Sequence, residues 1–284
     1  MRVLLFGGSG QLGSDILRLW RDDQIVAPSS AELNIENHGA VRAAVLRASP
    51  ELVVNCTAYN KVDAAETEPE RAFAVNTFAV EAMTQAAEDA NARFVTFSSD
   101  YVFDGEKGEP YAESDRPNPQ TVYGVSKLAG ELLVERHDSN ALIVRVCGLY
   151  GTRTSTSKGY TFIDRIIARA RAGEHVDVVS DQIVSPTYAA HVALAVRSLL
   201  DRAIGGVVHM VNEGAVSWYD FAIEALRAAA VDASIEPVSY ASWPATAKRP
   251  RFSALRNARL GAAGLSMPDW RTGIADYLRD KGAS

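Results

Sequence analysis

The chain has 284 residues, 47% of them hydrophobic, and a net charge of −6 at pH 7. This length suits one large or two modest domains with a sizeable core, and dispersed acidic residues without a basic stripe argue against a nucleic-acid partner. Apolar runs stay far below the roughly 20 residues that a membrane span requires, and the opening MRVLLFGG lacks a signal-peptide pattern. We therefore expect a cytoplasmic protein without a membrane partner, in which Cys56 and Cys147 are small core residues.

Strand-like and helix-like segments alternate through the first half of the chain. This order is typical of an α/β protein with a doubly wound parallel sheet, the Rossmann fold. The predicted elements, in chain order, are strand 3–6, helix 14–21, strand 24–27, helix 36–48, strand 52–56, helix 68–90, strand 94–98, helix 122–137, strand 141–149, helix 162–172, a helix that ends at 200, and strand 207–211.

The pattern loosens after residue 151, where a polar loop is predicted over 152–159. We predict a dinucleotide-binding domain made of residues 1–150 and about 188–211. The remaining segments, 151–187 and 212–284, are expected to form a smaller substrate-binding lobe.

The first predicted strand leads directly into a glycine turn. Gly7, Gly10 and Gly13 have the spacing G-x-x-G-x-x-G. Such glycines permit a tight turn, close approach of the backbone to a pyrophosphate, and anion binding at the N-terminus of the next helix. The turn predicts a dinucleotide site. The alternative, a glycine-rich loop without a ligand, is disfavoured by its position between a strand and an amphipathic helix.

A tyrosine and a lysine lie four residues apart in the predicted helix 122–137. Tyr123 and Lys127 therefore share one helical face. A phenol has an ordinary pKa of about 10, and a fixed ammonium charge nearby favours the phenolate. The pair predicts proton transfer at an alcohol or ketone. Ser98 and Ser99 end the preceding strand, where ligands bind in such folds, and can polarise a ketone oxygen; the alternative is that they only cap a loop.

Longer motifs resemble the extended short-chain dehydrogenases/reductases, and within them the dTDP-4-dehydrorhamnose reductase family. The resemblance covers essentially the whole chain. The glycine and Y-x-x-x-K motifs are shared by the superfamily, whereas DYVF, DQ-x-x-SPT, SWYDFA and RP-x-x-S-x-L are more specific. The matching segments include GGSGQLG at 7–13, VNCTAYNKVDAAE at 54–66, FSSDYVFDG at 97–105, YGVSKLAGE at 123–131, DQIVSPT at 181–187, SWYDFA at 217–222, KRPRFSALRNARL at 248–260 and MPDWRTGI at 267–274.

The resemblance implies a role for particular residues. It makes Tyr123 the proton donor, Lys127 the ligand of the nicotinamide ribose that also lowers the tyrosine pKa, and Ser99 a substrate-contacting hydroxyl. Asp100 and Tyr101 would face the sugar. The residues implied at the cofactor, besides Tyr123 and Lys127, are Gly7, Gly10, Gln11, Leu12, Gly13, Asn34, Ile35, Ala58, Tyr59 and Asn60.

Three positions depart from the family pattern. Gly148 stands where the family often has a tryptophan that stacks the substrate, so the nucleotide would stack elsewhere or the substrate would differ. Some members bind magnesium between subunits through acidic residues. Asp15 matches one of these and Ala190 replaces the second, so we expect no metal. Arg256 replaces an aspartate, either as a surface change or as an altered substrate contact.

The sequence thus predicts an NAD(P)H-dependent oxidoreductase that converts dTDP-4-dehydro-L-rhamnose to dTDP-L-rhamnose. Residues 25–30 contain neither an acidic residue nor an arginine, so NADPH is the expected cofactor and NADH should also be accepted. The expected partner is a nucleotide sugar, and the protein should be a monomer or weak homodimer. Alternatives are a reductase or epimerase of another nucleotide sugar and a non-catalytic NADP-binding regulatory subunit.

Overall fold

The computed structural model describes residues 1–138, 140–153, 159–202 and 204–282. Within them, six parallel strands form one sheet in the order β10-β5-β4-β3-β1-β2. The chain runs from β1 out to β2 and then returns to β3, so the topological switch point, where dinucleotides bind, lies between β1 and β3. The predicted Rossmann fold is confirmed. The strands are β1 (Arg2–Phe6), β2 (Gln24–Val26), β3 (Leu52–Asn55), β4 (Arg93–Ser99), β5 (Leu142–Val146) and β10 (Gly206–His209).

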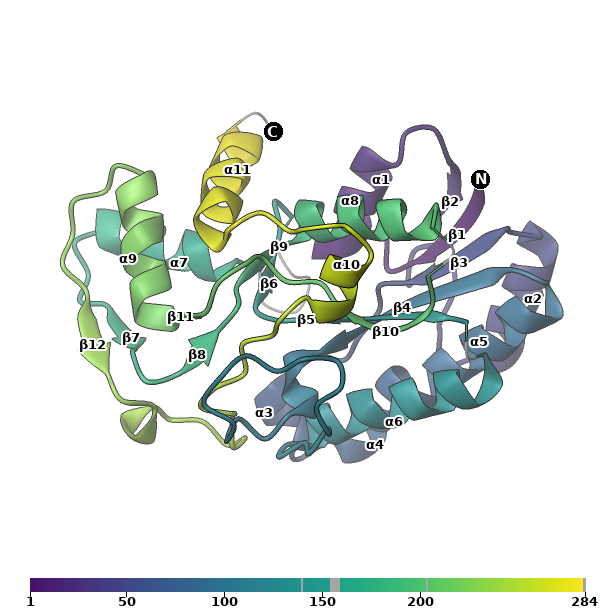
Figure 1. Ribbon diagram of the computed structural model, residues 1–284, viewed down its shortest axis with the longest axis horizontal. Helices are drawn as coiled ribbons and strands as arrows, with labels where there is room; N and C mark the ends of the chain where they lie inside the picture. The colour runs from purple at the N-terminus through teal and green to yellow at the C-terminus, as the bar shows by residue number, and fades with distance from the viewer. Residues whose placement is uncertain (139, 154–158, 203, 283–284) are drawn as a thin grey trace.

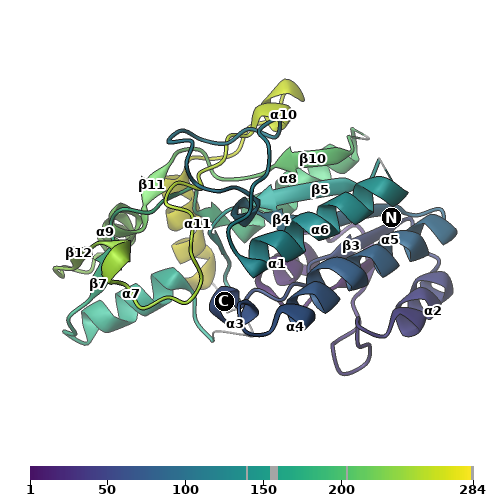
Figure 2. The same ribbon diagram turned by 90° about the horizontal axis from the view of Figure 1, so that it is seen from below.

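Helices cover both faces of this sheet (Figures 1 and 2). One layer consists of α1 (Gln11–Leu19) and α8 (Ala189–Leu200); the other contains α2 (His38–Ala48), α5 (Ala79–Asp89) and α6 (Val122–His137). Side chains alternate along a strand. Leu5 accordingly enters the core with α1 and α8, and its neighbour Phe6 the core with α2 and α5. This two-sided burial explains the continuous apolar runs of the strands.

A smaller lobe lies beside the sheet, at the left of Figure 1. Its helices α7, α9 and α11 enclose a separate core that contains Tyr188, Phe221 and Tyr277. The helices are α7 (Phe162–Arg171), α9 (Trp218–Ala228) and α11 (Trp270–Gly282), and α10 (Ala258–Ala262) returns to the sheet. The short strand pairs are β6 (Leu149–Tyr150) with β9 (Thr187–Tyr188), β7 (Asp177–Val179) with β12 (Glu236–Val238), and β8 (Ile183–Val184) with β11 (Val216–Ser217).

Two predicted elements differ from the structure. The strand predicted over 141–149 is interrupted, because Gly148 adopts a φ of +53° between β5 and β6. The helix predicted over 68–90 consists of α4 (Pro69–Phe73), a π-helical turn (Ala74–Phe78) and α5. The polar loop predicted over 152–159 lies mostly outside the described residues.

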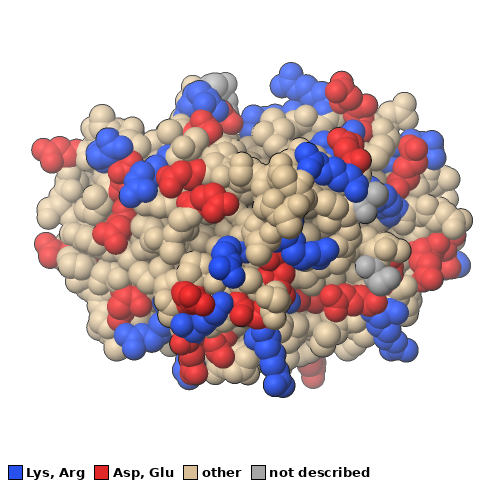
Figure 3. Space-filling view, in the orientation of Figure 1, with Lys and Arg blue, Asp and Glu red and all other residues tan. Residues whose placement is uncertain are grey.

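The surface carries charges of both signs. On the face in Figure 3, basic and acidic side chains are interspersed, so this face offers no single basic stripe to a nucleic-acid backbone. Across the described part of the chain, no helix combines the length and the apolar character that crossing a membrane requires.

Candidate active site

A cavity of about 470 Å³ opens between the carboxyl ends of the sheet strands and the smaller lobe. Strand ends supply Ser99 and Val146, whereas α7 and α9 supply Phe162 and Trp218. The cavity brings together eight of the residues predicted for the site. These are Gln11, Ala58, Asn60, Ser99, Asp100, Tyr101, Tyr123 and Lys127.

The glycine turn has the geometry that a dinucleotide needs. Gly7 has a φ of +82°, and a Cβ there would lie 2.9 Å from the Cys56 carbonyl carbon. A Cβ on Gly13 would lie 2.2 Å from the Gly7 oxygen, so both positions require glycine. Gly10 is the N-cap of α1 and contributes no capping side chain. The turn therefore leaves the N-terminus of α1 free of side-chain caps, which fits a pyrophosphate group.

The side chains of four other predicted cofactor residues pack in the core or form hydrogen bonds within the protein. Leu12 is buried in the core beside α8. The Tyr59 hydroxyl donates to Glu68 Oε2 at 2.9 Å. Ile35 packs on the core beneath α2, and Asn34 Oδ1 accepts the Glu36 amide. Cofactor contacts by these residues stay predictions. At Leu12 and Tyr59 only the backbone would be available for such a contact, because the side chains are buried or already engaged.

A buried amide that sequence analysis missed fixes the loop after β3. Asn76 lies in the π-helical turn, and its Oδ1 accepts the Tyr59 amide at 2.9 Å. Its Nδ2 donates to the Tyr59 carbonyl and to Ser126 Oγ, both at 3.0 Å. Asn76 thereby ties the loop of Ala58 and Asn60 to α6. The available signal was an asparagine inside a predicted helix, where its propensity is low.

Tyr123 stands in the first turn of α6 and faces the cavity. The helix begins there because Thr121 Oγ1 accepts the Gly124 amide. Gly124 also lets the helix lie against the Tyr101 carbonyl, which a Cβ would approach to 2.2 Å. The Tyr101 ring stands edge-on to the Tyr123 ring, with centroids 5.5 Å apart. Burial raises the pKa of Tyr123 to about 12, and the neighbouring Ser99 hydroxyl opposes this shift.

Lys127 lies one turn further along α6. Its Nζ donates to the Phe97 carbonyl at 2.6 Å. Burial lowers the pKa of Lys127 to about 8, and the charge of Glu131 opposes this shift. Burial, Ser99 and Asp100 shift the Tyr123 pKa in this structure, and the Lys127 ammonium does not. A lysine effect on the phenol therefore stays a prediction for the cofactor-bound protein.

Ser99 and Asp100 form a buried polar pair at the end of β4. Ser99 Oγ donates to Asp100 Oδ1 at 2.8 Å and accepts the Tyr101 amide at 3.2 Å. Cys147 Sγ donates to Asp100 Oδ2 at 3.2 Å. Burial raises the pKa of Asp100, against hydrogen bonds from Ser253, Cys147 and Ser99. Cys147 is thus a core residue, as predicted, that also contacts the site.

An aromatic side chain occupies the space beside Gly148. A Cβ on Gly148 would lie 3.1 Å from the Trp218 indole. The indole lines the cavity and packs on Phe162, with ring centroids 4.8 Å apart. Trp218 therefore presents an aromatic surface to the cavity beside Gly148. Arg256, by contrast, is exposed and lies outside the cavity lining, which favours the surface alternative for this departure.

Arginines from the smaller lobe reach the same cavity. Arg165 and Arg169 come from α7, and Arg249 from the segment before α10. Arg249 Nη2 donates to Asp63 Oδ2 at 2.5 Å, which joins the lobe to the short helix α3 (Val62–Ala65) after β3. Its Nε is buried and finds no hydrogen-bond partner among the described residues. These cations suit a diphosphate. Sequence analysis assigned none of them a role: Arg165 and Arg169 lie outside every quoted motif, and Arg249 was quoted only as part of the segment 248–260.

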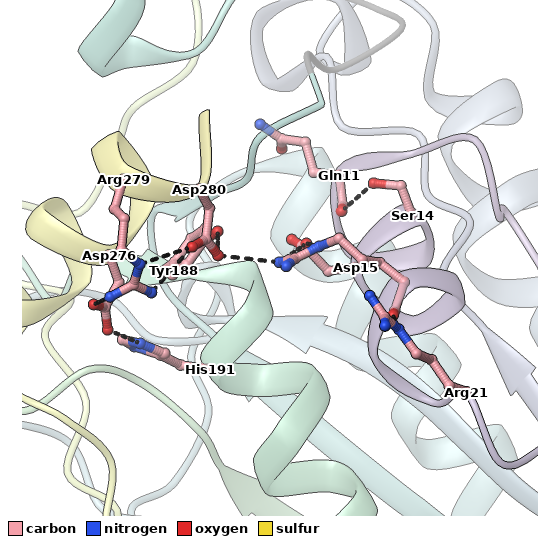
Figure 4. A network of polar contacts seen from close by, with 10 residues as sticks. Gln11, Ser14, Asp15, Arg21, Tyr188, His191, Asp276, Arg279 and Asp280 are labelled. Atoms are coloured by element: carbon pink, nitrogen blue, oxygen red, sulfur yellow. Dashed lines mark hydrogen bonds and ion pairs between the residues drawn. The ribbon is translucent and has the colours of Figure 1, made fainter. Parts of the chain in front are cut away.

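Asp15 belongs to an ion-pair network between α1 and α11 (Figure 4). Its Oδ1 accepts Arg18 Nη2 at 2.7 Å, and the same nitrogen lies 3.3 Å from Asp280. Tyr188 also donates to Asp280, at 2.9 Å. A guanidinium thus neutralises the carboxylate that resembles a metal ligand. Within the described residues, no group of three or more His, Cys, Asp or Glu side chains could hold a metal ion.

The glycine turn at the switch point, the Tyr-x-x-x-Lys helix and the adjacent serine define a short-chain dehydrogenase/reductase. Residues 1–282 match the family described as the RmlD substrate binding domain. The chain belongs to this family and is an NAD(P)-dependent oxidoreductase.

Known proteins match over their full length. The chain is 36% identical to a dTDP-4-dehydrorhamnose reductase of Streptomyces griseus, over 97% of this chain and 92% of that protein. It is 30% identical to the spore coat polysaccharide biosynthesis protein SpsK of Bacillus subtilis, over 100% and 99% of the two chains. A crystal structure of dTDP-4-dehydrorhamnose reductase from Bacillus anthracis in complex with NADP has a TM-score of 0.93 at 32% identity, covering 98% of this chain and 99% of that chain.

Proposed function

We propose that the protein reduces the 4-keto group of a nucleotide-linked 6-deoxy sugar, converting dTDP-4-dehydro-L-rhamnose to dTDP-L-rhamnose. The observation that carries this function is the single cavity into which Tyr123, Ser99 and Lys127 all project from the sheet side. Relatives named dTDP-4-dehydrorhamnose reductase, aligned over nearly the whole chain, support the choice of substrate.

The residues of the cavity divide the chemistry of a ketone reduction. When bound, the reduced nicotinamide supplies a hydride to the carbonyl carbon. Tyr123 gives a proton to the carbonyl oxygen, since its pKa of about 12 keeps the phenol protonated at neutral pH. Ser99 holds that oxygen beside the phenol. Lys127, with a pKa of about 8, is mostly charged at pH 7, and we expect this charge to favour the developing phenolate once the cofactor is bound.

The smaller lobe suits the nucleotide half of the substrate. Arg165 and Arg249 offer guanidinium groups to a diphosphate. Trp218 offers an aromatic face to a base or sugar ring. This division explains why arginines and aromatic residues enter the cavity from the lobe and hydroxyl groups enter it from the sheet.

The end of β2 bears on the choice of cofactor. NAD-specific sites place a carboxylate there for the adenosine ribose, and residues 27–30 provide none. The Glu32 carboxylate folds back and accepts the Ser29 amide and hydroxyl, both at 2.8 Å, so it is already engaged. We expect NADPH to serve at least as well as NADH.

A substrate panel tests both proposals. dTDP-, UDP- and GDP-linked 4-keto-6-deoxy sugars are each mixed with NADPH or NADH, and cofactor oxidation is followed by absorbance. The dTDP sugar with NADPH should give the highest kcat/KM. A UDP or GDP sugar reduced faster would move the assignment to another nucleotide sugar. A tenfold preference for NADH, about 1.4 kcal/mol, would contradict the cofactor argument.

A further inference from the structure

The carboxyl group of Asp100 is buried directly behind the Ser99 hydroxyl. Asp100 opens the short helix η2 (Asp100–Val102) after β4 and is 3% exposed. Its hydrogen-bond partners are the Ser99 hydroxyl at 2.8 Å and the Cys147 thiol at 3.2 Å, and the Ser253 hydroxyl, 4.0 Å from that thiol sulfur, also lowers the Asp100 pKa. All three are neutral, and within the described chain no lysine or arginine forms an ion pair with this carboxyl group. Burial without a cation favours the protonated acid.

Before a substrate binds, Ser99 has one hydroxyl hydrogen and two neighbours that compete for it. One is the Asp100 carboxyl group, and the other is the Tyr123 phenol, which lines the same cavity and whose pKa the Ser99 hydroxyl lowers. An ionised carboxylate accepts this hydrogen, which leaves only lone pairs for the phenol. A protonated Asp100 donates to Ser99 instead, which frees the serine hydrogen for the tyrosine oxygen. The protonation state of Asp100 therefore sets the direction of the whole hydrogen-bond chain.

We propose that Asp100 is the proton reservoir of the reduction and delivers its proton through the Ser99 hydroxyl to Tyr123. The proposal rests on the proposed function. Hydride addition to the carbonyl carbon breaks the C=O π bond, and the oxygen takes the Tyr123 proton. The phenolate then takes the Ser99 hydrogen, while Ser99 takes the Asp100 proton. Asp100 is left as a carboxylate, which regains a proton from water through the cavity it lines.

The other titratable groups around Asp100 leave this route open. Tyr101 on η2, Tyr123 on α6 and Cys147 after β5 face the carboxyl group, and burial raises the pKa of each. All three are neutral at pH 7 and none is a stronger acid than a carboxyl group. The segment before α10 contributes Ser253 and Arg249, and Arg249 pairs with Asp63. Burial likewise raises the pKa of Asp100 itself.

The experiment compares Asp100→Asn, Ser253→Ala and the wild type in the full chain. Asparagine keeps the size and the hydrogen bonds of Asp100 but holds no transferable proton. Alanine at 253 leaves the acid in place and removes a hydroxyl that lowers the Asp100 pKa. Turnover of the 4-keto sugar nucleotide is measured from pH 5 to 9. Infrared spectra of the ligand-free proteins report the protonated carboxyl band as the difference between wild type and Asp100→Asn.

The active form carries the proton, so wild-type kcat should be full below the Asp100 pKa and fall above it. This fall should vanish in Asp100→Asn, whose kcat is at least tenfold lower at neutral pH and declines only near the Lys127 pKa of about 8. In Ser253→Ala the fall should move to higher pH. The infrared band should disappear with the same midpoint as wild-type turnover.

Two results would overturn the proposal that Asp100 is the proton reservoir. One is an Asp100→Asn enzyme that keeps the wild-type pH profile and a kcat within twofold. The other is the absence of a protonated carboxyl band at any pH where the wild type turns over. If no nucleotide sugar is reduced, the proposed function fails, and the infrared titration alone then decides whether Asp100 holds a proton near neutrality. Should Asp100→Asn not fold, an unshifted profile in Ser253→Ala overturns the proposal.

Discussion

Burial makes the Tyr123 phenol a weaker acid than a free tyrosine, so its proton stays in place until a substrate accepts it. Its pKa of about 12 means that the phenol is protonated throughout the neutral range. The proton becomes available only when a neighbouring oxygen acquires negative charge, as a carbonyl does on accepting a hydride. Lys127 behaves oppositely. Burial lowers its pKa to about 8, so its charge is present below that pH and lost above it.

Replacing Tyr123 by phenylalanine should separate catalysis from binding. The ring and its packing against Tyr101 remain, whereas the proton is lost. General acid catalysis contributes roughly 10² to 10⁴ in rate, so kcat should fall by that factor while the Kd of NADPH stays unchanged. Lys127→Met should lower turnover and weaken cofactor binding together. A Tyr123→Phe enzyme within threefold of the wild-type single-turnover rate would exclude this tyrosine as the acid.

Replacing Trp218 by alanine should weaken binding of the sugar nucleotide. The indole fills the space beside Gly148 and lines the cavity from the lobe. Loss of its aromatic surface should raise KM by roughly tenfold, about 1.4 kcal/mol, with little change in the Kd of NADPH. Ile223→Ala, at an exposed position of the same helix α9, is the control. An unchanged KM would show that the substrate stacks elsewhere.

At the scale of elements, local sequence signals were enough to predict the parallel sheet and helix α6. The predicted bounds of α6, residues 122–137, agree with the structure, because the cap at Thr121 and the apolar spacing are local features. The strand predicted over 141–149 was wrong at Gly148, which has a positive φ and lies against Trp218, a residue 70 positions away. The π-helical turn likewise depends on distant partners, since Asn76 bonds to Tyr59 and Ser126.

Replacing Asn76 by alanine should destabilise the fold around the loop after β3. The change leaves the buried Tyr59 amide and carbonyl without their partner, which costs about 1–3 kcal/mol. Urea unfolding should show this loss as a lower midpoint. Phe78→Ala, at an exposed position of the same π-helical turn, should change stability by less than about 0.5 kcal/mol. Equal effects of the two substitutions would argue against a special role for the amide.

At the scale of the whole molecule, the site lies between two lobes that polar contacts hold together. Arg249 joins the smaller lobe to Asp63, and Arg18 joins α1 to Asp280 of α11. Neither pair could be predicted, because long-range contacts leave no spacing in the sequence. The same reason explains the short strands, such as β7 and β12, whose paired residues are 59 positions apart. Motifs predicted residues such as Tyr123 and Lys127 that line the cavity, whereas Arg165 and Arg169 of α7 lie outside every quoted motif.

Removal of divalent cations should leave the protein unchanged. Arg18 already neutralises Asp15, and Ala190 on α8 offers no second carboxylate for a metal ion. Activity and molecular mass, measured by light scattering, should be the same after EDTA as after EDTA saturated with magnesium. The mass should be that of a monomer or a weak homodimer. Activity lost in EDTA and restored by magnesium would contradict this account.

The most direct test of the central claim is the stoichiometry of one reaction. The protein is mixed with dTDP-4-dehydro-L-rhamnose and a limiting amount of NADPH, and the product is identified by NMR while absorbance records the cofactor. We predict one dTDP-L-rhamnose formed for each NADPH oxidised. A rearranged sugar without net oxidation would indicate an epimerase, and an unchanged sugar with bound NADPH would indicate a non-catalytic subunit; either result would contradict the account.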